Sequence, residues 1–274
     1  MHTRSSIPIL AAVLQWAAPA TSAILLSGGT IIAWDFETEL PRVIRDGSVL
    51  VEGNTITSVE EGVPASIPDG TEIVDCTDKI ITPGFVDTHR HGWQTVFKTL
   101  GSNTSLTEYF NRYGEFAAAS ALSADDIYIS QLAGLYEAIN AGVTTTLDHA
   151  HHTWSRETSR AGLRASLDSG ARVFWAYTFH DASNFTFEDQ VDDWLELYAN
   201  TTSNTTEVVI AYDGWSSDDE QTETVTNLIR DNNVTVVTAH SLGGPWCCEY
   251  LNYVHASAPF HCPSPLSPLF DPDI

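Results

Sequence analysis

Two histidines two residues apart follow a run of strand-forming residues in the first half of the chain. In TPGFVDTHRHG, residues 82–92, they are His89 and His91. Alternate side chains of a strand point to the same face, so two imidazoles at this spacing can bind one ion. A third ligand must come from elsewhere, and His240 stands at the end of another apolar run, VTVVTAHS. The pattern predicts one divalent metal held by His89, His91 and His240, with zinc expected and iron left open.

Such a site has a specific chemistry. A metal held by three protein ligands, with one position open, lowers the pKa of a bound water to about 7 and makes it a nucleophile at neutral pH. A lone His-x-His pair also occurs in loops, so the prediction depends on its companions.

Seven of the ten histidines fall where a predicted strand runs out into a loop. Barrel enzymes build their active sites on this face. We expect Trp93 and Gln94, which follow the histidine pair, and the strand-end residues His149 and His180 to contact substrate. Core packing is an equally good interpretation for Trp93, and loop-fixing hydrogen bonds are the alternative for the two histidines. His151 and His152 are interpreted as solvated loop residues.

The elements that would position these residues change character near residue 82. Residues 24–82 read as all-β, with a hairpin at Gly53-Asn54, because this pair accepts the backbone of a two-residue turn. Residues 83–246 alternate between strand and helix patterns, with helices near 124–141, 156–169, 186–199 and 217–231. This alternation predicts an α/β fold, a parallel sheet with crossover helices, and five repeats without reversal favour a (β/α)₈ barrel over an open doubly wound sheet.

The barrel is expected to be incomplete. A full barrel takes eight strands and about 250 residues, whereas residues 247–274 carry five prolines and no clear period. We interpret them as an irregular tail. Because a partial barrel exposes sheet edges, poor solubility or oligomerisation is expected.

The first 23 residues resemble an export signal. Arg4 precedes an apolar stretch, and Thr-Ser-Ala precedes a predicted cut after Ala23. Five Asn-x-Ser/Thr sequons follow, at Asn103, Asn184, Asn200, Asn204 and Asn233. Together they predict a secreted glycoprotein.

The charge restricts the partners. Twelve Lys and Arg against 36 Asp and Glu give a formal net charge of −24. Such an acidic chain repels nucleic acid and anionic lipid, so we expect neither as a partner. A small-molecule substrate fits the predicted site.

Several spaced motifs resemble the amidohydrolase superfamily of metal-dependent hydrolases. They are LLSGGTII, DGSVLVEGNTITSVEEG, IVDCTDKIITPGFVDTHRHGWQ and AGVTTTLDH, in the order of the family, and the similarity runs from about residue 24 to 246. The branch with cytosine deaminase, adenosine-type deaminases and triazine chlorohydrolases is the most similar. The resemblance implies a small β-sandwich of residues 24–82 beside a barrel of residues 83–246. It also implies His89, His91 and His240 as metal ligands, and hydrolysis of carbon–nitrogen bonds in amide or amidine substrates.

The chain also departs from this family. Family deaminases carry a proton-transferring glutamate three residues after the fifth-strand histidine, where this chain has Gly243. The sixth-strand histidine and eighth-strand aspartate of the family would lie beyond the last residue, so no catalytic acid or base is assigned within the chain. The alternatives are an inactive, truncated fragment or a secreted metal- or ligand-binding module.

Overall fold

The computed structural model describes residues 23–215 and 219–240. The predicted signal segment (except Ala23), Gly243 and the predicted tail lie outside the described residues. The chain divides into two compact units, residues 1–83 and 84–274, and each is described by itself.

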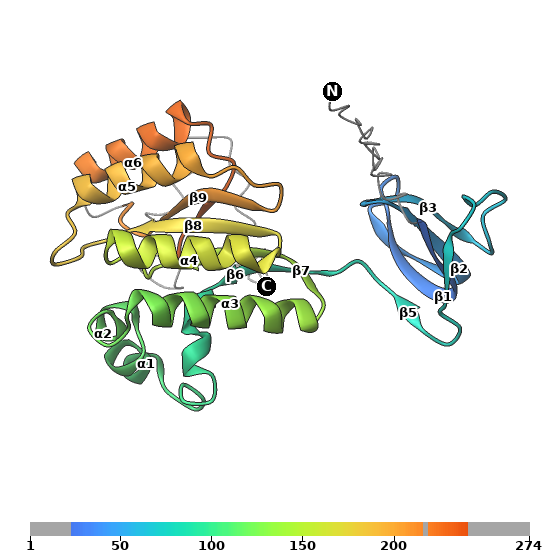
Figure 1. The fold of residues 1–274 in the computed structure, drawn as a ribbon, viewed down its shortest axis with the longest axis horizontal. Helices are drawn as coiled ribbons and strands as arrows, with labels where there is room; N and C mark the ends of the chain where they lie inside the picture. The colour runs from blue at the N-terminus through green and yellow to red at the C-terminus, as the bar shows by residue number, and fades with distance from the viewer. Residues whose placement is uncertain (1–22, 216–218, 241–274) are drawn as a thin grey trace, which may run out of the picture. The chain divides into compact units, whose positions relative to one another are not determined.

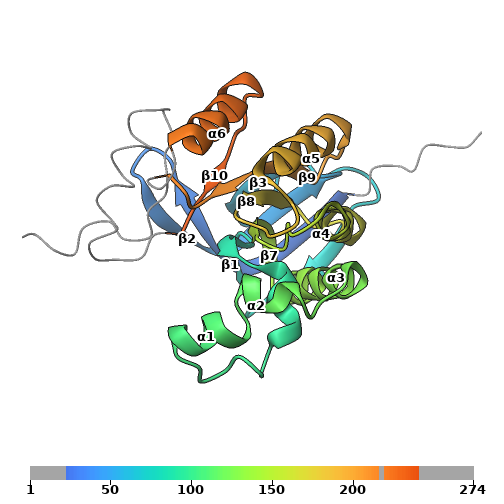
Figure 2. The same cartoon turned by 90° about the vertical axis from the view of Figure 1, so that its left-hand side faces the viewer.

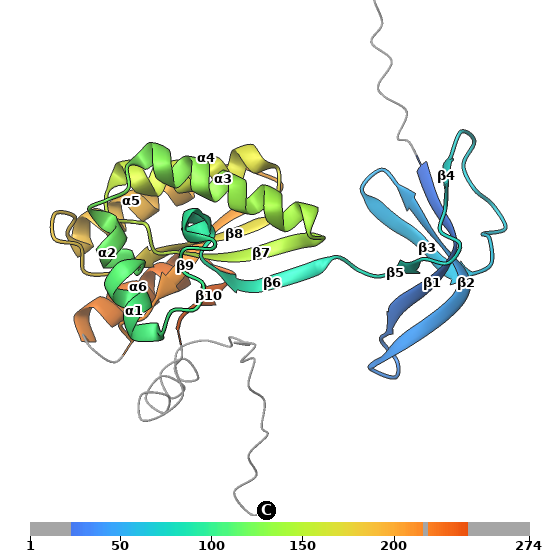
Figure 3. The ribbon, with the colours of Figure 1, turned by 90° about the horizontal axis from the view of Figure 1, so that it is seen from below.

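The first unit is built on one long strand. Its strands are β1 (Ala23–Asp35), β2 (Leu40–Glu52), β3 (Thr55–Glu61), β4 (Glu72–Asp75) and β5 (Ile80–Ile81). β1 pairs with β2 on one side and with β4 and β5 on the other, and the predicted hairpin joins β2 to β3, with Gly53 at a φ of 64°. Residues 23–83 are built of strands only, and these pair into one five-stranded sheet (Figure 3). The predicted β-sandwich stays a prediction.

The second unit is a parallel sheet with helices. Its strands run in the order β10-β9-β8-β7-β6, all adjacent pairs being parallel. Their bounds are β6 (Phe85–Arg90), β7 (Val143–Ala150), β8 (Val173–Phe179), β9 (Thr206–Tyr212) and β10 (Val237–Thr238). Ile80 and Ile81 pair with β1 in the first sheet, so the second sheet begins at Phe85.

Four long helices connect these strands. They are α3 (Ala124–Asn140), α4 (Arg156–Ser169), α5 (Phe187–Asn200) and α6 (Asp219–Asp231). They cover one face of the sheet, which curls around its other face (Figures 1 and 2). This is the expected partial (β/α) barrel.

Local sequence explains four of the eight ends of these helices. The side chains of Ser123, Ser155 and Thr186 accept the backbone N–H three residues on, each in a capping box. Gly170 ends α4 in the left-handed conformation at a φ of 68°, which costs glycine little. Three short helices between β6 and α3 were not predicted: η1 (Gly92–Phe97), α1 (Leu106–Arg112) and α2 (Glu115–Ala119).

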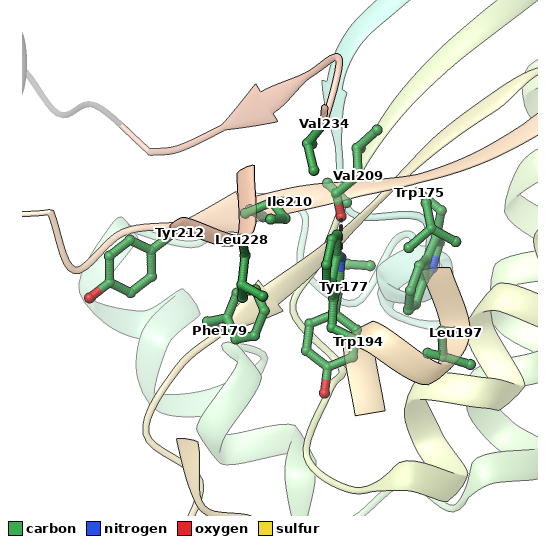
Figure 4. Close-up of a cluster of buried hydrophobic side chains, with 14 of the residues drawn as sticks. Trp175, Tyr177, Phe179, Trp194, Leu197, Val209, Ile210, Tyr212, Leu228 and Val234 are labelled. Carbon is green, nitrogen blue, oxygen red and sulfur yellow. Dashed lines mark hydrogen bonds between the residues drawn. The ribbon is translucent and has the colours of Figure 1, made fainter. Parts of the chain in front are cut away.

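The core lies between the sheet and these helices. Trp175 and Tyr177 on β8, Val209 and Ile210 on β9, and Trp194 on α5 are all fully buried (Figure 4). The indole N–H of Trp194 donates to the carbonyl of Val209 at 3.3 Å. Both faces of β8 and β9 are largely buried, as is usual for the centre of a parallel sheet. Within the described ranges, no helix is long and apolar enough to cross a membrane.

Candidate metal centre

Histidines from the two opposite edges of the second sheet meet. His89 and His91 belong to the edge strand β6 and the residue after it, and His240 follows the other edge strand, β10. The Nε2 atoms of His91 and His240 are 3.1 Å apart, and the ring centroids of His89 and His240 are 4.9 Å apart. The Nδ1 atom of His89 lies 3.3 Å from the hydroxyl of Thr238 on β10. The curvature of the sheet therefore brings the first and fifth strands together, and with them the three predicted ligands.

A fourth histidine lies among them. His149, at the end of β7, is fully buried, and neither of its ring nitrogens has a hydrogen-bond partner. One ligand atom each of His89, His149 and His240 lies within 4.8 Å of the others, a spacing that suits a metal ion. This group shares two members with the predicted set and has His149 where the prediction has His91.

Hydrogen bonds orient the rings. The Nδ1–H of His91 donates to the carbonyl oxygen of His149 at 2.8 Å, which leaves Nε2 as the free lone pair. The Nδ1–H of His240 donates to Asp213 at 2.8 Å, and the backbone N–H of His240 donates to the other oxygen of the same carboxylate at 2.6 Å. Metal-binding histidines characteristically donate their second nitrogen in this way.

Two aspartates at strand ends support the site. The sequence suggests a pocket-lining or loop-fixing role for Asp148, and Asp213 was not predicted as a site residue. Asp213 follows β9 directly, and the sequence signal was the same strand-end placement that marked the histidines. Asp148 is fully buried beside His149, and its carboxylate accepts the backbone N–H of Gly92 at 2.8 Å. This bond fixes the chain immediately after His91.

The electrostatics suit cation binding. Burial lowers the pKa of His89, lowers that of His91 to about 3, and lowers that of His149 well below its usual range. Burial would raise the pKa of Asp213, but the hydrogen bonds and charge of His240 outweigh it and lower that pKa to about 2. His89, His91 and His149 are thus neutral at neutral pH, as metal binding requires. Burial would lower the pKa of His240, but its hydrogen bond to Asp213 raises that pKa, so an ion bound there displaces a proton from His240. The orphaned nitrogens of His149 also fit an ion.

His151 lies behind His91. Its ring stacks on that of His91 at 3.9 Å between centroids, and its Nδ1 accepts the indole N–H of Trp93 at 3.0 Å. The carboxylate of Glu115, on α2, lies 3.5 Å from the Nδ1 of His151 and 3.8 Å from the Nδ1 of His180. Glu115 was missed because no pattern in the sequence marks it.

His151 and His152 are buried, so their interpretation as solvated residues was wrong. The His152 ring packs against α4, where a Cβ added to Gly162 would come within 2.1 Å of its Cε1 atom. The glycine therefore makes room for the imidazole.

The four predicted substrate contacts lie in different surroundings. Trp93 is fully buried with Ala118 and Ile127, and both ends of the Gln94 amide are engaged by the Tyr109 hydroxyl, at 2.7 and 3.0 Å. His149 lies among His89, His91 and His240. The Nε2–H of His180 donates to the carbonyl of Thr153 at 3.1 Å. Contact of all four with substrate stays a prediction.

Relatives of this chain are deaminases. It is 31% identical over 136 residues to the 5'-deoxyadenosine deaminase of Methanosarcina mazei, which covers 48% of this chain and 30% of that protein. Over 158 residues it is 26% identical to a 5-methylthioadenosine/S-adenosylhomocysteine deaminase of Pyrococcus horikoshii, covering 58% of this chain and 34% of that protein. These matches span about a third of the relatives' length.

Solved structures share the fold. The guanine deaminase of C. acetobutylicum, with bound guanine, superposes with a TM-score of 0.69 at 19% identity, over 87% of this chain and 57% of that one. An adenosine deaminase of Xanthomonas campestris with bound zinc gives a TM-score of 0.64 at 17% identity, over 82% of this chain and 50% of that one. The family model of amidohydrolases matches residues 80–253. The chain belongs to the amidohydrolase family.

Proposed function

We propose that this chain carries the metal-binding part of a hydrolase that cleaves carbon–nitrogen bonds other than peptide bonds in a small cyclic amidine or amide. The observation that carries the proposal is the meeting of imidazoles from the two edges of the second sheet, His89 and His91 with His240. The names of the relatives, deaminases of nucleosides and of guanine, support the substrate class.

The proposed cofactor is one divalent ion. We expect zinc, because all the proposed ligands are imidazoles, which suit this metal. When bound, it supplies a water that is nucleophilic near neutral pH. His89, His91 and His240 would hold it. Asp213 keeps the Nδ1 proton of His240 in place, so that Nε2 is the nitrogen offered to the ion.

Other residues near the ion offer contacts for substrate. The Nδ1 atom of His180 is buried without a hydrogen-bond partner, and it is an acceptor because Nε2 carries the proton. Glu115 lies beside it and is partly exposed, so its carboxylate can accept a hydrogen bond from an amino or hydroxyl group. A substrate with several N–H or O–H donors can therefore form hydrogen bonds to His180 and Glu115.

The test is metal content together with turnover. The purified full chain and a His89→Ala/His91→Ala variant would be analysed for bound metal, then assayed with aminopurine nucleosides and aminotriazines for release of ammonia or amine. We expect zinc near one equivalent and turnover in the wild type, and neither in the variant. Equal turnover by both proteins would refute the proposal.

A second candidate is a metal- or ligand-binding module without turnover. Gly243, where the resemblance places a proton-transferring glutamate, favours it. Zinc bound at one equivalent with no product from any substrate, under conditions in which a related deaminase is active, would select this candidate.

We also propose that the chain is exported and glycosylated. All five sequon asparagines are exposed, as the attachment of glycans requires. Expression in a eukaryotic secretory host, followed by glycosidase treatment, would test this: a mass loss is expected, and retention of an unmodified chain in the cell would contradict it. The expected absence of nucleic-acid and membrane partners, and the expected oligomer, stay predictions.

A further inference from the structure

We propose that His149 is a fourth metal ligand, so that His89, His91, His149 and His240 together surround one ion. This inference rests on the metal-dependent function proposed above and adds a residue that the sequence pattern assigned to substrate. The ligand would come from the second strand of the barrel, between the strands that carry the histidine pair and His240.

The spacing of the four rings carries the inference. Zinc bound to four imidazoles in a tetrahedron, at about 2.0–2.1 Å to each nitrogen, would place neighbouring ring centroids about 5.2 Å apart. His89 lies 5.0 Å from His91, 5.3 Å from His149 and 4.9 Å from His240. His91 lies 5.3 Å from His149 and 5.0 Å from His240, and only the pair of His149 and His240 is closer, at 4.2 Å. Five of the six centroid distances match a tetrahedral arrangement. One ring nitrogen each of His89, His149 and His240 lies within 4.8 Å of the others, and His91 joins this group through its Nε2, 3.1 Å from the Nε2 of His240.

The state of the His149 ring is the second observation. Both ring nitrogens are buried without a hydrogen bond, and an unpaired buried polar group destabilises the folded protein. The nearest carboxylate oxygen, on Asp213, is 3.7 Å from Nε2, which is too long for a hydrogen bond. Coordination of an ion would give one of these nitrogens a partner.

His151 provides the contrast. It is also buried, and it lies two residues further along the chain. Its distances to the other rings are unequal: it stacks on His91 at 3.9 Å and lies 5.8 Å from His149 and 6.2 Å from His240. Its Nδ1 is occupied by Trp93. Both histidines are therefore buried close to the other rings. Of the two, only His149 has ring distances that suit coordination of the same ion.

Four imidazoles also set a condition on catalysis. Four protein ligands close the coordination sphere of tetrahedral zinc, as in structural sites, so a water can enter only as a fifth ligand. Replacing His149 would open one position.

The experiment compares His149→Gln with His151→Gln in the full chain. X-ray absorption at the zinc edge would count imidazole ligands, and competition with a chelator would give the zinc dissociation constant. We expect four imidazoles in the wild type and in His151→Gln. In His149→Gln we expect one imidazole fewer and an affinity weaker by about tenfold or more.

Other results would overturn the inference. Three imidazoles in the wild type, with equal zinc affinity in the two variants, would exclude His149 as a ligand and leave the proposed function standing. A wild type that binds no zinc would overturn both. Because His149→Gln can fail to fold, circular dichroism accompanies each sample, and the ligand count of the wild type decides the question without any variant.

Discussion

The centre and the edges of the second sheet differ in almost every respect. On β8 and β9, at the centre, Trp175, Tyr177 and Ile210 are fully buried. On the edge strand β6, Phe85 and Val86 are 66% and 61% exposed, and the opposite edge strand β10 has only two residues. The predicted metal ligands nevertheless lie at the edges. The centre thus supplies the apolar packing, and the edges supply the chemistry.

Curvature connects the two regions. A flat sheet would separate its edge strands by four strand spacings, each about 4.8 Å. Here the His89 and His240 rings are 4.9 Å apart, because the packed centre holds the sheet in a curl. The site therefore depends on packing that none of its own residues provides.

The largest expected effect is a loss of stability when the centre of the second sheet is changed. Trp194→Ala would leave a cavity under β9 and remove the hydrogen bond to Val209, so we expect the free energy of unfolding to fall by about 3–5 kcal/mol. Urea unfolding followed by circular dichroism measures it. A loss below about 1 kcal/mol would mean that the centre is not what stabilises the sheet.

The next effect is a pH dependence. Burial lowers the pKa of His152 to about 3, against 6.5 when exposed, so between these values the unfolded state takes up the proton first. Stability is therefore fully present above about pH 6.5 and falls as the pH drops toward 3. His152→Gln should flatten this dependence, measured as unfolding free energies at several pH values with a chelator present. The same slope in wild type and variant would contradict the expectation.

A smaller effect, on zinc affinity, is expected at Asp213, which connects a central strand to an edge strand. Asp213, after β9, holds His240, after β10, by two hydrogen bonds. Asp213→Asn keeps the size but loses the charge, and we expect zinc affinity to fall by about 10- to 100-fold, as for other second-sphere carboxylates, with little change in unfolding free energy. Competition titration checks the affinity. The matched control is Asp181→Asn, an exposed aspartate next to His180, which should change neither.

The smallest effect is at the edge itself. Phe85→Thr removes an exposed ring from β6, and we expect the unfolding free energy to change by less than about 0.5 kcal/mol. The variant should also aggregate less, because exposed apolar strand edges promote association. Light scattering compares the two proteins. A loss of several kcal/mol would show that this edge is packed in solution.

Much of the fold could be predicted because its signals are local. Ser123 and Gly170 mark helix ends through their own backbone chemistry, and Gly53 marks a turn. The strand–helix alternation then required a parallel sheet. The short helices α1 and α2 escaped prediction because their stretch has no sustained apolar period.

The sequence by itself determined the histidine pair, since the two-residue period of a strand puts His89 and His91 on one face wherever that strand lies. Only the tertiary structure decided which distant groups meet the pair. His149, Asp213 and His240 lie 58 to 149 residues from His91 along the chain, and equal strand-end signals marked histidines that do and do not reach the cluster. The physical reason is that the packing of β8 and β9 against their helices sets the curvature of the sheet. This curvature determines which strand ends come together.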